Sequence, residues 1–168
     1  CTKVETWQKT KWYDSIVLGV EAHEIAARLE PYAADYAFAS NGYADAVTLG
    51  YNARRYFSVF GEASSHARHD DILTDFAALA GKNILILRKS EPGADEYTPY
   101  FREVKVETFA LRGVTFYEIF GRGFDYVRYR DQVLATVRDK YYRIPAHLPQ
   151  TACYFHERYW PEQPWPPR

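Results

Sequence analysis

The run at residues 83–87, Asn-Ile-Leu-Ile-Leu, has no polar residue between its apolar positions. Gly81 and Lys82 break the pattern before it, and a polar stretch with proline and glycine breaks it afterwards. Successive side chains of a strand point to opposite faces, so an uninterrupted apolar run predicts a strand covered on both faces. We predict that this is the central strand, flanked by helices at 71–80 and 95–101, which makes the fold class α/β.

The chain before this strand has the order of a βαβ unit. Apolar residues recur at spacings of three and four over residues 14–30, which predicts one amphipathic helix that ends before a proline. A first strand is predicted at 36–40, and it leads through an Asn-Gly turn into a helix at 43–51 with Asn41 as its N-cap. A second strand is predicted at 55–60.

The chain after the central strand predicts an antiparallel edge. Residues 103–109 and 114–120 flank a glycine-containing turn and form a predicted hairpin. A long helix is predicted at 126–142, and the prolines of 147–168 predict an extended tail that wraps the domain or is partly disordered. We predict a three-layer α/β/α sandwich in one domain, residues 1–146, with a mostly parallel, Rossmann-like sheet and an antiparallel edge hairpin.

Composition narrows the function classes. The 168 residues are 47% hydrophobic and 26% charged, which suits one globular domain. The net charge of -1 comes from 21 basic and 22 acidic side chains mixed along the chain, so no nucleic-acid partner is predicted. No run approaches the roughly 18 apolar residues that a membrane-spanning helix needs.

The N-terminal residues carry a different signal. The sequence has no methionine, so we expect its native start to be missing. Trp7 and Trp12 lie among lysines, so residues 1–13 are predicted to be a membrane-proximal lead-in, although a frayed terminus has the same composition. Aromatic residues make up 17% of the chain, and either carbohydrate contact or ordinary core packing explains them. Cys1 and Cys153 match no metal spacing, and a disulfide between them stays open.

A ligand site is expected in the loops that follow residues 40, 60 and 87. In open α/β sheets, ligands bind beyond the carboxyl ends of the parallel strands. The loops are polar but hold no recognised catalytic set. The Gly-x-Gly-x-x-Gly series and the Gly-x-Ser-x-Gly elbow are both absent from the sequence, so neither a nucleotide-binding site nor a serine hydrolase is predicted.

The loop after residue 60 offers two interpretations. His66, His69, Asp70 and Asp71 are residue types that bind divalent metals. Alternatively, the two aspartates cap the next helix and Arg68 pairs with one of them. We favour the second interpretation, and we predict no metal and no cofactor.

Three segments together resemble a known family. They are 36–51 (YAFASNGYADAVTLGY), 67–76 (ARHDDILTDF) and 81–87 (GKNILIL). They are similar to the soluble C-terminal region of bacterial membrane-embedded glycosyltransferases in three respects. A strand leads to a tyrosine-containing turn, an arginine-containing loop leads to a helix, and Gly-Lys-Asn precedes a hydrophobic strand. The resemblance is to the dolichyl-phosphate-mannose protein mannosyltransferases and the lipid A aminoarabinose transferase.

This resemblance implies an accessory domain on the periplasmic face of the inner membrane. The catalytic carboxylate would lie in a preceding transmembrane region, and the implied partners are that region, the membrane surface and a lipid-linked sugar or glycan acceptor. We expect Arg68, His69 and Lys89 to meet a phosphate and Tyr43 to stack on a sugar ring. The candidate substrate-binding residues are Asn41, Tyr43, Arg68, His69, Asp70 and Lys89.

Two other functions remain open at this point. One is a free-standing α/β enzyme, such as a hydrolase, that uses the loop at residues 64–71. The other is a carbohydrate-binding module that relies on exposed aromatic side chains. Turnover by the purified chain would indicate the enzyme, whereas glycan binding without turnover would indicate the module.

Overall fold

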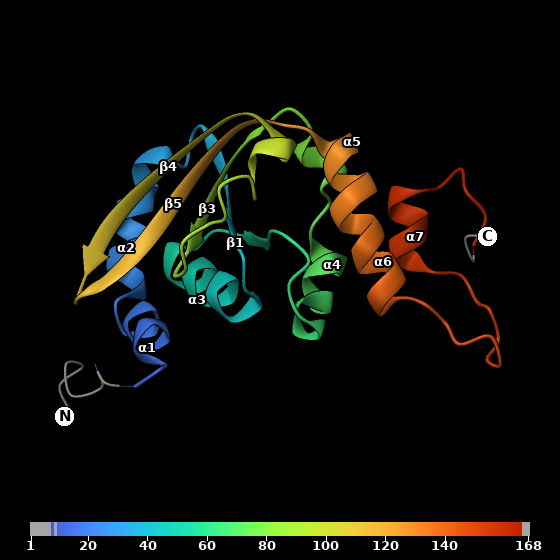
Figure 1. Cartoon of the computed structure of the whole chain (residues 1–168), viewed down its shortest axis with the longest axis horizontal. Coiled ribbons are helices and arrows are strands. Elements are labelled where there is room, and N and C mark those ends of the chain that lie inside the picture. The colour runs from blue at the N-terminus through green and yellow to red at the C-terminus, as the bar shows by residue number, and fades with distance from the viewer. Residues whose placement is uncertain (1–7, 9, 166–168) are drawn as a thin grey trace.

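The computed structural model describes residue 8 and residues 10–165. They form an α/β fold with a single open sheet of five strands in the order β2-β1-β3-β5-β4 (Figure 1). The strands are β1 (Tyr36–Ser40), β2 (Phe57–Val59), β3 (Asn83–Arg88), β4 (Phe101–Leu111) and β5 (Val114–Phe124). β1 pairs in parallel with β2 and β3, whereas β5 pairs antiparallel with β3 and β4. The sheet is therefore mixed rather than mostly parallel, because two of its four strand pairings are parallel and two are antiparallel.

The prediction that residues 83–87 form the central strand is confirmed. β3 is the middle strand of the sheet, and Ile84 to Leu87 are fully buried. Leu85 and Leu87 point into one hydrophobic cluster, while Ile84 and Ile86 point into the other. Alternation along one strand thus places half of its apolar side chains in each core.

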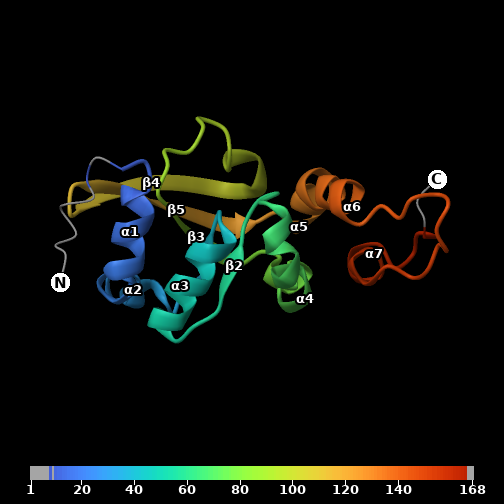
Figure 2. The same cartoon turned by 90° about the horizontal axis from the view of Figure 1, so that it is seen from below.

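One face of the sheet is covered by α1 (Tyr13–Val20), α2 (Ala22–Leu29) and α3 (Tyr43–Ala53) (Figure 2). The prediction of one continuous helix over 14–30 is wrong. Glu21 leaves the helical conformation between α1 and α2 and is buried, and its carboxylate accepts a hydrogen bond from Arg112 Nε at 3.0 Å. A distant arginine therefore accompanies a break that the apolar spacing does not reveal.

The other face is covered by residues around Tyr97 and by the C-terminal helices, which extend beyond one end of the sheet (Figure 1). The helical segment predicted at 126–142 is confirmed, with an internal π turn. It consists of α5 (Tyr126–Tyr129), the π turn Arg130–Leu134 and α6 (Ala135–Tyr141). The helix predicted at 95–101 is reduced to a 3₁₀ turn, Thr98–Tyr100.

The C-terminal tail is not wholly extended, because it contains α7 (Tyr154–Tyr159). Pro149 and Pro161 lie outside this helix, so neither interrupts it. Phe155 and Trp160 are buried in the same cluster as β3 side chains, so this part of the tail packs on the domain. The boundary at residue 146 stays a prediction. Cys153 is buried, whereas Cys1 lies outside the described residues, as does most of the predicted lead-in.

The helix predicted at 71–80 is wrong. A 3₁₀ turn, Ser65–His69, leads into the one-turn helix α4 (Asp70–Leu73), and Thr74 is extended. Arg158 donates hydrogen bonds to the carbonyls of Asp71, Ile72 and Thr74, which satisfies the end of α4. Ile72 and Leu73 are not covered by the sheet, since they are 55% and 60% exposed.

The hairpin is confirmed, but its second strand does not end at Gly121 as expected. β5 continues to Phe124. A Cβ atom on Gly121 would lie 2.6 Å from the ring of Phe101, so the glycine allows that ring to cover the strand. Pairing with β4 therefore continues through Gly121, which lies opposite Val104, to Phe124, which lies opposite Phe101.

Candidate functional site

The structure forms a groove of about 340 Å³ between α3, α4 and the segment that leads into β2. We call it the α3–α4 groove. It lies beside β2, which is the short edge strand of the sheet. The side chains that concern its chemistry are Tyr43, Val47, Tyr51, Tyr56, His69, Asp70 and Leu73.

One wall of the groove is a single face of α3. Tyr43, Val47 and Tyr51 are four residues apart, and this spacing places side chains above one another on a helix. Tyr51 is 84% exposed, so its ring is open to solvent. Of these three residues, only Tyr43 was predicted from the sequence, although the same spacing of four was a signal for the other two.

The close return of the chain after α3 depends on Gly50. A Cβ atom on this residue would lie 2.9 Å from the carbonyl oxygen of Arg55. Arg54 then adopts a left-handed conformation with φ 51°, which ends the helix. This tight reversal brings Tyr56 alongside α3, where its side chain lines the groove.

Asp70 forms the floor of the groove and links α4 to the sheet. Its buried carboxylate accepts hydrogen bonds from the Val59 backbone N–H at 2.9 Å and from Thr74 Oγ1 at 2.9 Å. It also accepts a hydrogen bond from the Tyr56 hydroxyl. The N-cap of α4 is His69 and no side chain caps it, so the predicted capping role of Asp70 and Asp71 is wrong.

Tyr56 is held as a neutral hydrogen-bond donor. Burial raises the pKa of its hydroxyl, and the hydrogen bond to Asp70 raises that pKa further. The hydroxyl also lies 2.7 Å from Thr74 Oγ1. Although the hydroxyl is engaged, the residue as a whole is exposed, so its ring remains available at the groove.

His69 and Tyr43 close one end of the groove. Their rings meet edge to face, with centroids 6.4 Å apart and planes at 88°. Their hydroxyl and imidazole groups, together with Arg55 and Asp70, bring polar atoms to a lining that is otherwise aromatic or apolar. Sites of this kind combine apolar surface with a few polar groups that orient a ligand.

Arg68 lies outside the groove and faces α6. Its guanidinium donates to the carbonyl of Glu62 at 3.0 Å, pairs with Asp71 at 3.1 Å and lies 4.5 Å from the centroid of the Tyr141 ring. The prediction that Arg68 pairs with one of the two aspartates is confirmed. Burial raises the pKa of Asp71 to about 6, although a hydrogen bond from Tyr142 and the charge of Arg68 oppose the rise.

Lys89 and Asn41 also lie outside the residues that line the groove. Lys89 Nζ donates to Ser15 Oγ at 2.8 Å and to Asp45 Oδ1 at 3.0 Å, which links the end of β3 to α1 and α3. Asn41 does not cap α3, because the N-cap is Gly42 and no side chain bonds there. Of the six predicted residues, the structure therefore brings Tyr43, His69 and Asp70 together.

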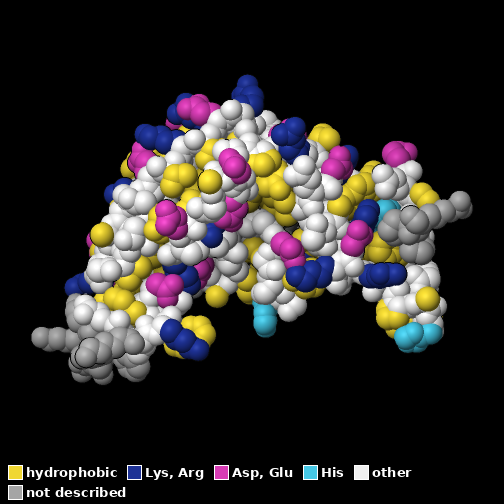
Figure 3. Space-filling model, in the orientation of Figure 1, with side chains coloured by type: hydrophobic (Ala, Val, Ile, Leu, Met, Phe, Trp, Pro, Cys, Tyr) yellow, Lys and Arg dark blue, Asp and Glu magenta, His cyan; other side chains and the backbone are white. Residues whose placement is uncertain are grey.

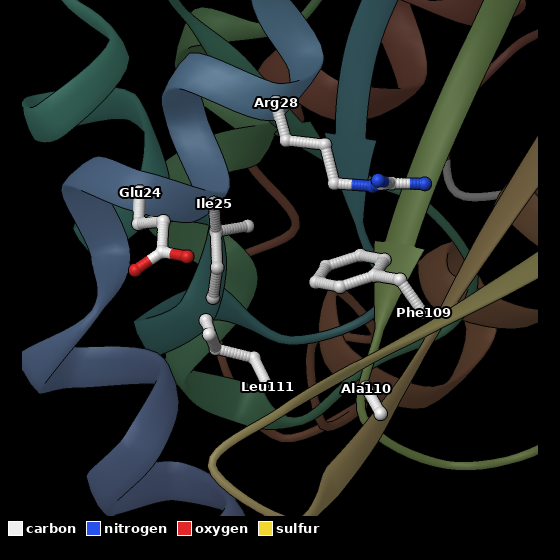
Figure 4. A pocket seen from close by; sticks show the side chains of 6 residues that line it. All are labelled: Glu24, Ile25, Arg28, Phe109, Ala110 and Leu111. Carbon is white, nitrogen blue, oxygen red and sulfur yellow. The ribbon is translucent and has the colours of Figure 1, made fainter.

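A second pocket, of about 220 Å³, lies between α2 and the end of β4 (Figure 4). The Arg28 guanidinium reaches across it, above the Phe109 ring, and makes two hydrogen bonds to Glu118, at 2.9 and 3.1 Å. Glu118 is completely buried, and Arg28 is its partner. The polar groups here hold α2 on the sheet, so this pocket ranks below the α3–α4 groove as a ligand site.

The titratable side chains that line the groove are His69, Asp70, Arg55 and the tyrosines Tyr43, Tyr51 and Tyr56. Asp70 is the one carboxylate among its lining residues, and both of its oxygens already accept hydrogen bonds. Among the described residues, no three His, Cys, Asp or Glu side chains are grouped to hold a metal ion. Acidic and basic side chains are interspersed over the face shown in Figure 3.

No helix in the described part of the chain combines the length and the hydropathy needed to cross a bilayer. Comparisons of the chain with protein-family models, curated proteins and solved structures found no match.

Proposed function

We propose that this chain is a sugar-binding accessory domain of a membrane glycosyltransferase that uses a polyprenyl-phosphate sugar donor. The observation that carries the proposal is the α3–α4 groove, where Tyr43, Tyr51 and Tyr56 present rings around one cavity. Tyrosine suits carbohydrate because its ring packs on the apolar face of a sugar while its hydroxyl bonds to polar groups.

The size and charge of the groove support a sugar phosphate as its ligand. Its volume of about 340 Å³ lies near the lower end of the roughly 300–1,000 Å³ found for small-molecule sites. Arg55 also lines it, and its exposed ion pair with Glu30, at 3.1 Å, contributes little free energy. A phosphate that approaches Arg55 therefore displaces a weak partner.

The accessory role follows from the chemistry of the same groove. With the Asp70 oxygens engaged, catalysis by a carboxylate would come from the transmembrane region to which the resemblance points. We place the domain on the periplasmic face of the inner membrane, next to that region and the lipid surface. We also propose that the parallel strands β2, β1 and β3, with α3 between β1 and β2, form the reduced core of a Rossmann-like three-layer fold.

The test is a titration of the ¹⁵N-labelled chain with mannose 1-phosphate, followed by amide chemical shifts. We expect the largest shifts along α3 and at residues 54–57. Tyr51→Ala should weaken binding by about 2- to 10-fold, whereas Tyr51→Phe retains the ring and should bind nearly as well as the wild type. Tyr51 is so exposed that neither change should alter the fold.

Inorganic phosphate is the matched control ligand. If it binds as tightly as mannose 1-phosphate, the groove does not recognise a sugar, and the proposal fails. The proposal is also refuted if mannose 1-phosphate causes no amide shifts in the groove of the wild-type chain. Turnover of a glycoside by the purified chain, lost in His69→Ala, would show that the chain is instead a free-standing enzyme.

A further inference from the structure

The two edges of the sheet differ in how they are protected. β2, at one edge, has three residues, and Asp70 Oδ2 accepts the hydrogen bond of its Val59 N–H. β4, at the other edge, has eleven residues, and β5 is its paired strand (Figure 1). Long unprotected edge strands are templates for pairing with another strand.

The hairpin turn determines which backbone groups of β4 face outward. Arg112 and Gly113 both have positive φ, and they join Leu111 to Val114 in a two-residue turn. The residues that close such a turn bond to each other, so alternate residues counted back from Leu111 bond to β5. The residues between them, including Val104, Val106 and Thr108, direct their N–H and C=O groups away from the sheet.

Two charged side chains of β4, Lys105 and Glu107, form an exposed ion pair within the chain, and the same two charges match those of an identical antiparallel strand. In an antiparallel pair with its two-fold axis at Val106, Lys105 lies opposite Glu107 of the second copy, and Glu107 lies opposite its Lys105. These would be pairs without backbone hydrogen bonds, in which facing side chains are closest. Val106 is 46% exposed, and it would meet its own copy at the axis.

A second feature of the same alignment is also complementary. Glu103 of the second copy would lie opposite Phe109, where the Arg28 guanidinium sits 4.4 Å from the ring centroid. The alignment therefore brings a carboxylate towards a cation on each side of the axis. A one-residue shift of the register would lose both sets of charge contacts.

The geometry points to a homodimer formed by antiparallel pairing of β4 with β4 of a second copy, which joins the two sheets into one sheet of ten strands. The partner is a second copy of this chain because the charges of β4 complement themselves about Val106. The inference is independent of the sugar-binding proposal, since the α3–α4 groove lies beside β2 at the other edge.

The test is sedimentation equilibrium of the full chain from about 1 μM to 1 mM, a range suited to a small interface. The wild type should approach twice its mass of 19.6 kDa. Lys105→Glu places glutamates opposite glutamates, and Glu107→Lys places lysines opposite lysines, so each variant alone should dimerise at least about tenfold more weakly. An equimolar mixture of the two should regain wild-type affinity as a heterodimer.

Val106→Pro tests the backbone contribution. It removes an outward N–H that β5 does not use, so the hairpin should keep its fold, as measured by thermal unfolding, while dimerisation is lost. Val106→Thr keeps the N–H and should still dimerise. Three results would each overturn the inference. The wild type could stay at 19.6 kDa at every concentration, the single charge variants could dimerise like the wild type, or the mixture could fail to recover wild-type affinity.

Discussion

Replacing Asp71 with asparagine should stabilise the protein near neutral pH, although it removes an ion pair. Burial raises the pKa of the Asp71 carboxyl group from its usual 3.8 to about 6. A raised pKa means that the folded chain binds the proton more tightly than the unfolded chain does. Between pH 4 and pH 6, stability therefore falls as the pH rises, and above pH 7 the penalty for the buried charge is complete.

The size of the effect follows from the same shift. At 1.36 kcal/mol per pKa unit, a rise from 3.8 to about 6 corresponds to at most roughly 3 kcal/mol. Asparagine can still accept the hydrogen bond that the Tyr142 hydroxyl donates at 2.7 Å, but Arg68 loses its anionic partner. We therefore expect Asp71→Asn to raise the free energy of unfolding by about 1–3 kcal/mol at pH 7.5 and to leave it unchanged at pH 4.

The assay is urea denaturation at half-unit steps from pH 4 to pH 8. The control is Asp95→Asn, at an exposed position, which should run parallel to the wild type. If Asp71→Asn is less stable than the wild type at pH 7.5, the pair with Arg68 outweighs the burial of charge. If its profile parallels that of the wild type from pH 4 to pH 7, Asp71 does not titrate as we infer. Either result would refute the reasoning.

Two further variants test the contacts that hold the helices on the sheet. Arg28→Ala leaves the buried Glu118 carboxylate unpaired and should lower the free energy of unfolding by about 3–5 kcal/mol. Adding Glu118→Gln to this variant should recover part of the loss. If the double variant is no more stable than Arg28→Ala, the pairing is contradicted. Asp70→Ala removes the acceptor for the β2 amide, and urea denaturation should show a free energy of unfolding lower by about 2–4 kcal/mol. The amide shifts that mannose 1-phosphate causes along the α3–α4 groove should also be lost. Unchanged shifts in this variant would show that Asp70 does not shape the groove.

Local signals predicted several elements correctly. The apolar run of β3 and the alternation of the hairpin depend on neighbours within a few residues, and both elements form as expected. The helical segment from Tyr126 to Tyr141 also follows its own spacing. Such elements could be predicted because the signal and the structure involve the same short stretch of chain.

Two of the errors occurred where a partner lies far away along the chain. Arg112 bonds to Glu21, 91 residues before it, at the break between α1 and α2. Arg158 bonds to the Thr74 carbonyl, 84 residues before it, at the end of α4. In both places, a distant arginine donates a hydrogen bond at the end of a helix, to a carboxylate in the first case and to a backbone carbonyl in the second. The spacing of apolar residues within the helix does not indicate such a partner.

The candidate site shows the same division. Sequence patterns were enough to predict the α/β class, the central strand, the edge hairpin and a candidate site that includes Tyr43, His69 and Asp70, although these three lie in helical segments after β1 and β2 rather than in loops. Three features became visible only in the folded chain: Asp70 bonds to β2, Arg68 and Lys89 form ion pairs away from the groove, and Tyr51 and Tyr56 join Tyr43 at one groove. Periodicity follows from the geometry of one helix or strand, whereas a groove exists only where separate segments meet.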